Sequence, residues 1–124
     1  TGHGVGFFLR VHEPPQGFAE STTTTRGSTA LKEGTVSSNE PGFYEKNQFG
    51  IRIENLIYVK KIKNKLKFVD LTLAPIDKSL ILKNLLTTSE KNWLNIYHKK
   101  VFKHLNQFMN KFELSQLKQA CSNI

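Results

Sequence analysis

Two histidines and two glutamates are the residues of this sequence best suited to chemistry. His3 and His12 stand on either side of a glycine-rich and then apolar stretch, and Glu40 and Glu54 lie on or beside expected strands. Imidazole and carboxylate groups are hard-to-borderline ligands, which suit divalent Mn, Co, Zn or Fe better than a metal that prefers thiolates. His3, Glu40 and Glu54 are therefore candidate ligands of a metal site, which their types and spacing alone leave open.

The positions of the glutamates leave a second interpretation open. Arg52 and Glu54 are two residues apart, so on a strand both side chains project from one face, while Ile51 and Ile53 point to the other face, toward the expected core. A carboxylate on a buried strand is costly unless it is paired or metal-bound. The pattern alone allows an ion pair between Glu54 and Arg52, with Glu40 as a solvated strand end.

The histidines are equally ambiguous by themselves. The glycines beside His3 permit a close backbone approach or a positive φ angle. On one straight strand, His3 and His12 would lie roughly 30 Å apart, so a shared site requires a bend at Gly4 and Gly6; otherwise one of them is a structural histidine. His98 and His104 lie among lysines in an expected helix, and we interpret both as surface residues.

The first part of the sequence predicts strands. Residues 5–11 form a mostly apolar run, which Pro14 and Pro15 should end because proline donates no hydrogen bond to a sheet. Residues 18–30 have little apolar content and predict an exposed loop. Further expected elements are a turn at 31–34, strands at 35–39, 50–60 and 66–73, a chain reversal at Pro41-Gly42 and a hairpin turn at 63–65.

After Pro75 the pattern becomes helical. Asp77 can cap a short helix that carries Leu80, Ile81, Leu82 and Leu85. Thr87 and Glu90 fit a capping box. The next helix carries an amphipathic stripe at steps of four and three, namely Trp93, Tyr97, Val101, Leu105 and Phe108, and a last helix covers residues 113–121. Strands followed by helices predict an α+β fold, in which C-terminal helices cover one face of an antiparallel sheet.

Composition narrows the class of protein. The 124 residues carry a formal net charge of +8, but the lysines at 60, 61, 63, 65 and 67 come with no nucleic-acid motif, so we expect no nucleic-acid partner. No apolar run approaches the roughly 18 residues needed to cross a bilayer, so we expect no membrane partner. The single cysteine, Cys121, favours a reducing, cytoplasmic location. The start without Met, inside a glycine-rich stretch, suggests a piece of a longer protein.

Four ordered segments resemble a known family. His3-Gly4-Val5-Gly6, Val11-His12-Glu13, residues 38–44 (SNEPGFY) and residues 49–55 (FGIRIEN) are similar to the C-terminal part of the catalytic domain of aminopeptidase P. These Xaa-Pro aminopeptidases are pita-bread metallopeptidases. The likeness continues through residues 71–77 and 90–98, and is weakest at 17–30. It implies that residues 1–76 are the sheet portion of the catalytic domain and residues 77–124 a C-terminal helical extension of it.

The resemblance also implies roles for the candidate residues. His3, Glu40 and Glu54 would bind two divalent metal ions, usually manganese, with cobalt or zinc as substitutes, and Glu54 would bridge both. Glu40 would also be the general base, His12 would contact the substrate and steady the tetrahedral intermediate, and Arg52 would keep the carboxylates ionised and in place. The substrates would be peptides with proline second.

This sequence departs from the family in one respect. Two aspartates and another histidine, which complete the ligand set in the family, are not among these 124 residues. We therefore expect the chain alone to be inactive, with an upstream catalytic half or a homo-oligomer as its partner. The alternative is a non-catalytic remnant that serves as a scaffold or dimerisation piece.

Overall fold

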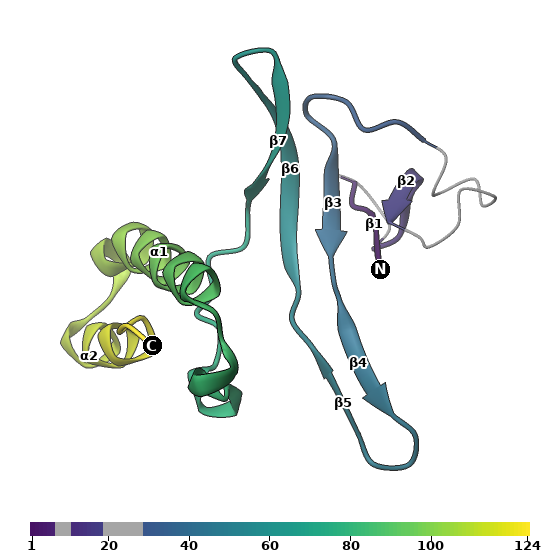
Figure 1. Ribbon diagram of the computed structural model, residues 1–124. Coiled ribbons are helices and arrows are strands. Elements are labelled where there is room, and N and C mark those ends of the chain that lie inside the picture. Colours follow the sequence, from purple (N-terminus) through teal and green to yellow (C-terminus); the bar gives the residue numbers. More distant parts are fainter. Residues whose placement is uncertain (7–10, 19–28) are drawn as a thin grey trace. The chain divides into compact units, whose positions relative to one another are not determined.

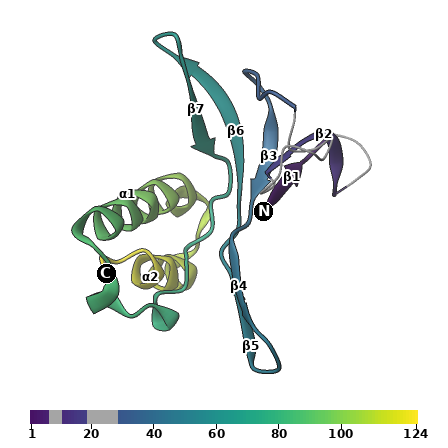
Figure 2. The same cartoon turned by 45° about the vertical axis from the view of Figure 1, so that its right-hand side comes forward.

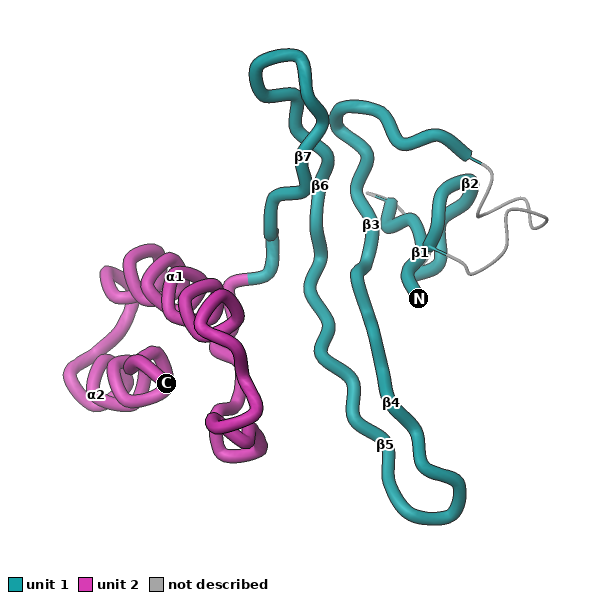
Figure 3. Tube along the Cα trace, in the orientation of Figure 1, with its two compact units in different colours: residues 1–72 teal, residues 73–124 magenta. Residues whose placement is uncertain are grey.

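The described residues form two compact units. The computed structural model describes residues 1–6, 11–18 and 29–124 (Figure 1). Its units are Thr1–Thr72, which holds the described strands, and Leu73–Ile124, which holds the described helices (Figure 3). The predicted α+β class is confirmed. The covering of the sheet by helices and the division after residue 76 stay predictions.

The first unit is an antiparallel sheet with the strand order β2-β1-β3-β6-β7. A separate two-stranded ribbon pairs β4 with β5. The strands are β1 (Gly2–Gly4), β2 (Glu13–Phe18), β3 (Val36–Asn39), β4 (Gly42–Glu45), β5 (Phe49–Arg52), β6 (Asn55–Ile62) and β7 (Lys65–Asp70).

One register runs through both sheets. Asn39 pairs with Asn55 at the end of the β3–β6 pairing, and Gly42 pairs with Arg52 at the start of the β4–β5 pairing. Figures 1 and 2 show β3 continuing into β4 and β5 into β6 as one long ribbon. The predicted reversal at Pro41-Gly42 is therefore wrong. The chain turns back after β4 instead, where Asn47 adopts a positive φ of 60°, a conformation that asparagine tolerates.

The expected strand over residues 50–60 is interrupted at Ile53 and Glu54. Ile57 and Val59 are buried, as their alternation predicts, but Ile51 and Ile53 are both 46% exposed, so their expected place in the core is wrong. The reason lies in the topology: β6 is flanked by β3 and β7, whereas β5 pairs with β4 alone. The hairpin turn at Lys63 and Asn64 is confirmed, and both residues have positive φ.

The two prolines do not end a strand as predicted, because Glu13–Phe18 is itself strand β2. This strand lies at the edge of the sheet, and an edge strand tolerates proline since one side of its backbone needs no ladder bond. Of the expected strand over 5–11, residues 7–10 lie outside the described residues, and Val11 is exposed. Most of the expected loop over 18–30 also lies outside them.

The second unit contains two α-helices and three single-turn 3-10 helices. They are η1 (Lys78–Leu80), η2 (Lys83–Leu85), α1 (Thr88–Leu105), η3 (Asn106–Phe108) and α2 (Lys111–Ala120). Asp77 caps η1, and the predicted capping box of Thr87 and Glu90 begins α1. The short helix expected after Asp77 is two separate turns, and Leu80, Leu82 and Leu85 are exposed.

The core of the second unit lies between α1 and α2. Its buried residues are Tyr97, Val101, Leu117 and Cys121. Helix α1 also buries Leu94 and His98, so the buried stripe is centred away from Trp93, which is 51% exposed. None of the described helices is long and apolar enough to cross a membrane.

The expectation that His98 is a surface residue is wrong. Its side chain is fully buried, and its Nε2 atom accepts a hydrogen bond from the Ile76 main-chain N–H at 3.1 Å. The neighbouring Tyr97 hydroxyl donates to the Ala74 carbonyl at 2.9 Å. These two adjacent side chains hold residues 74–76 against α1, a role that a lysine-rich local sequence does not reveal. His104 is exposed, as expected.

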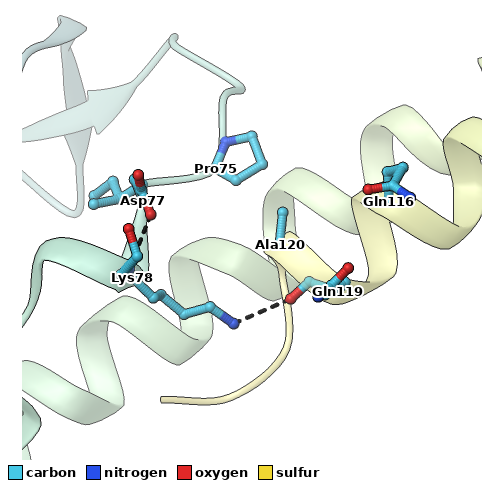
Figure 4. A pocket seen from close by; sticks show the side chains of 8 residues that line it. Pro75, Asp77, Lys78, Gln116, Gln119 and Ala120 are labelled. Carbon is cyan, nitrogen blue, oxygen red and sulfur yellow. Dashed lines mark hydrogen bonds between the residues drawn. The ribbon is translucent and has the colours of Figure 1, made fainter.

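Lys78 fastens η1 to the end of α2. Its amino group donates to the carbonyl oxygen of Gln119 at 3.2 Å (Figure 4). It also donates to the carbonyl oxygen and the hydroxyl of Ser122, both at 2.6 Å. A cation at a helix C-terminus also compensates the helix dipole. A pocket of about 460 Å³ lies beside this contact, and none of the candidate site residues lines it.

We predict that Leu117→Ala destabilises the chain by about 2–5 kcal/mol, because it removes buried apolar atoms and leaves a cavity. Leu80→Ala makes the same chemical change at a residue that is 71% exposed, and should cost less than about 0.5 kcal/mol. Urea unfolding followed by the fluorescence of Trp93, the one tryptophan of the sequence, measures both. Equal losses in the two variants would contradict the assigned core.

We also predict that the free energy of unfolding of the chain decreases as the pH is lowered, because of His98. Burial, with the positive charge of Lys78, lowers the pKa of His98 below its ordinary value of 6.5. As the pH falls below about 6.5, the unfolded chain binds a proton that the folded chain resists, so stability falls until the lowered pKa is reached. His98→Gln should flatten this dependence in urea unfolding between about pH 7.5 and pH 5.5, whereas His104→Gln should keep it. An unchanged slope in His98→Gln would count against the assignment.

Candidate metal centre

The register of the sheet places four candidate residues on one face. Because Asn39 is opposite Asn55 and Gly42 is opposite Arg52, Glu40 comes opposite Glu54 across the ribbon. Residues two apart on a strand share a face, so Arg52 joins the two glutamates. Strand β1 pairs with β3 through Gly4 and Ser37, which sets His3 opposite Ser38 on that same face.

Glu40 is the centre of the cluster. It is 8% exposed, and its two carboxylate oxygens have different partners. Oε1 accepts a hydrogen bond from the Ser38 hydroxyl at 2.8 Å and lies 3.2 Å from His3 Nε2. Oε2 lies 3.1 Å from a guanidinium nitrogen of Arg52. The open alternative of an ion pair between Arg52 and Glu54 is therefore replaced by one between Arg52 and Glu40, which is not a solvated strand end.

These partners keep Glu40 ionised. The Ser38 hydrogen bond lowers the pKa of the Glu40 carboxyl most, and the charges of Arg52 and His3 lower it further, against the opposing effect of burial. Arg52 has a second contact, since its guanidinium carbon lies 5.8 Å from the centre of the Tyr44 ring. The buried Glu40 side chain therefore carries a negative charge at neutral pH.

His3 directs one ring nitrogen at this charge. Its Nδ1 lies 2.9 Å from the Gly4 carbonyl oxygen, and a carbonyl only accepts, so Nδ1 carries a proton. Nε2 then faces Glu40 Oε1, and two lone pairs would oppose each other unless a proton or a cation lies between them. Two ligand atoms each about 2.1 Å from one ion can lie at the observed separation of 3.2 Å.

His12 lies against His3, although the two are nine positions apart in the sequence. The two rings meet edge to face, with centroids 4.2 Å apart, so the two side chains are as close as a shared site requires. Among the described glycines only Gly34 has positive φ, and the glycines beside His3 serve a close approach instead. A Cβ atom at Gly4 would clash with the Glu13 carbonyl oxygen.

The donor set fits a divalent cation in part. His3 and Glu40 are in contact, and Glu54 is opposite Glu40 in register, but its residue is exposed. Across residues 1–6, 11–18 and 29–124, no group of three or more His, Cys, Asp or Glu side chains lies close enough to hold a metal ion. An imidazole nitrogen beside an ionised carboxylate is borderline-to-hard ligand chemistry, so the two groups in contact fit a metal that needs further ligands.

Sequence reasoning missed Ser38. Its side chain is fully buried, accepts a hydrogen bond from the His3 main-chain N–H at 2.9 Å and donates to Glu40. One signal could have found it, since Ser38 stands two residues before Glu40 and so shares its face of the strand. A serine in that position can reach the carboxylate.

Comparisons with known proteins cover almost the whole chain. Residues 1–61 match the model of metallopeptidase family M24, and residues 64–124 match the model of the C-terminal region of that peptidase family. A probable Xaa-Pro aminopeptidase P of Coprinopsis cinerea is 43% identical over all of this chain, and a Xaa-Pro aminopeptidase of Caenorhabditis elegans is 42% identical, again over all of it.

A solved structure has the same fold. The crystal structure of X-prolyl aminopeptidase from Caenorhabditis elegans, described as a cytosolic enzyme with a di-nuclear active site, matches all of this chain with a TM-score of 0.84 and 41% identity. The α+β fold expected from the pita-bread resemblance is thereby confirmed. The chain spans 21% of the length of that structure and of both named relatives. With both family models matched in order, the chain belongs to metallopeptidase family M24.

Proposed function

We propose that the protein is a metal-dependent aminopeptidase that hydrolyses the peptide bond between an N-terminal residue and a following proline. The carrying observation is the buried Glu40 carboxylate, held between His3 Nε2 at 3.2 Å and Arg52 at 3.1 Å. Xaa-Pro aminopeptidases among its relatives support the substrate class. The protein would be a hydrolase of peptides, and an upstream catalytic half would complete its site.

His3, Glu40 and Glu54 would hold two divalent metal ions, with manganese as the first candidate and cobalt or zinc as substitutes. The di-nuclear site of the Caenorhabditis elegans structure supports the number of ions. Two such ions would supply an acidic bound water and a polarised scissile carbonyl. The remaining ligands would come from residues outside this chain.

Three residues of this chain would act in proton transfer, orientation and substrate binding. Glu40 is ionised and would accept the proton of the attacking water as general base. Arg52 would keep that carboxylate oriented through Oε2. His12 stands against the His3 ring on an exposed part of the chain, where its imidazole can contact the substrate and donate a hydrogen bond to the oxygen that gains charge.

We place the protein in the cytoplasm. Its sequence here carries one cysteine, and that residue is free and buried. An unpaired cysteine suits a reducing compartment. The relative of known structure is described as cytosolic, which supports the same location.

We predict that Glu40→Gln in the complete protein lowers kcat/KM for an Xaa-Pro peptide roughly 10²–10⁴-fold, because an amide accepts no proton. Glu45→Gln is the matched control: Glu45 lies on β4, is exposed, and points to the opposite face of the ribbon. Release of the N-terminal residue, measured with and without a chelator and added manganese, tests the function. Chelator-resistant cleavage, or equal activity in the two variants, would reject it.

We also predict that residues 1–124 alone bind metal weakly and cleave no Xaa-Pro peptide. The physical reason is the small ligand set, since His3 and Glu40 are in contact but no group of three such side chains forms within the described ranges. Purified chain is mixed with manganese and an Xaa-Pro peptide, and product is followed by mass spectrometry. Measurable turnover would show that the chain needs no further ligands.

A further inference from the structure

We propose that Ser38 is a positioning residue that sets two of the three proposed metal ligands of this chain, His3 and Glu40, in the orientation a cation requires. This inference rests on the proposed function and adds a residue to it. Ser38 would touch neither substrate nor metal. It would act through the two side chains that do.

The geometry is that of a relay. The His3 main-chain N–H donates to Ser38 Oγ at 2.9 Å, and Ser38 Oγ donates to Glu40 Oε1 at 2.8 Å. A second acceptor, the His3 carbonyl oxygen, lies at 3.5 Å. A hydroxyl has one proton, and the shorter contact to an ionised acceptor is the stronger bond. The proton therefore points at Glu40, and each bond of the relay polarises the next.

The hydrogen bonds of the relay fix the orientation of the Glu40 carboxylate. With Ser38 on Oε1 and Arg52 on Oε2, rotation of the Glu40 carboxylate would break both contacts. The same hydroxyl anchors the main chain of His3, whose Nε2 faces Oε1 at 3.2 Å. One buried side chain thus governs the separation between two prospective ligands on neighbouring strands. Partners of this kind behind metal ligands commonly change metal affinity strongly.

The strand offers a matched control one residue away. Ser37 is 3% exposed and Ser38 is fully buried, so the two serines of strand β3 have similar burial. Adjacent residues on a strand point to opposite faces. The Ser37 hydroxyl has no hydrogen-bond partner within the described part of the chain. Ser37→Ala and Ser38→Ala therefore remove the same atom from the same strand, and only the second breaks the relay.

The experiment measures manganese binding to the metal-free complete protein by titration calorimetry. We expect Ser38→Ala to weaken manganese affinity roughly 10- to 100-fold, and Ser37→Ala to change it less than about twofold. Ser38→Thr keeps the hydroxyl and should restore most of the affinity. With the metal in large excess, Ser38→Ala should regain activity with an unchanged KM for the peptide, which a general loss of structure would not allow.

Glu40→Gln separates this inference from the proposed function. If Glu40→Gln weakens manganese binding and Ser38→Ala does not, the role of Ser38 is rejected while the metal site stands. Equal losses in Ser38→Ala and Ser37→Ala would reject it as well, because the effect would belong to strand β3 as a whole. If Glu40→Gln leaves manganese affinity unchanged, the ligand assignment itself fails, and the role of Ser38 fails with it.

Discussion

A buried negative charge is the constraint on which the site depends. Glu40 is 8% exposed, and an ionised carboxylate in that environment is tolerated only when its oxygens are satisfied. Ser38, His3 and Arg52 supply those contacts from three different strands. The sheet and the β4–β5 ribbon must therefore bring β1, β3 and β5 into register before Glu40 can stay charged. The charge state of Glu40 therefore depends on the pairing of these strands.

A single strand register brings the residues of the site together. β3 and β4 run opposite β5 and β6 in a single alignment, so the interruption of both ladders falls where Glu40 comes opposite Glu54. Two like charges opposite each other destabilise a sheet. An arginine beside Glu40, and a cation bound between carboxylates, are the two means of offsetting that repulsion. Arg52 provides the first at 3.1 Å.

The resemblance to the family grouped the candidate residues, whereas their spacing alone left that grouping open. In the structure His3 lies against His12 and Glu40, and Glu40 lies against Arg52; their roles stay predictions. Burial was harder, since it depends on which strands and helices flank a residue. Ile51 alternates like a core residue but lies on a ribbon of two strands, and His98 stands among lysines but is fully buried and bonded to the Ile76 main chain.

Ser38 was predicted neither as a site residue nor as a core residue. Its type is unremarkable in a strand, and only the position of His3 opposite it makes its hydroxyl a link between two ligands. Sequence periodicity places Ser38 on the right face, but the pairing of β1 with β3 is a long-range contact that no local pattern encodes.

The ion-pair and metal interpretations of Glu40 are compatible. Arg52 engages Oε2, while Oε1 faces His3 Nε2, so the two oxygens are divided between a fixed cation and a group that can bind a second one. A lysine could neutralise the charge equally, but the planar guanidinium of arginine holds a carboxylate in a more defined orientation. Arg52 therefore leaves Oε1 to face His3, and its ion pair with Glu40, unlike the Arg52–Glu54 pair that the sequence left open, is compatible with the proposed metal site.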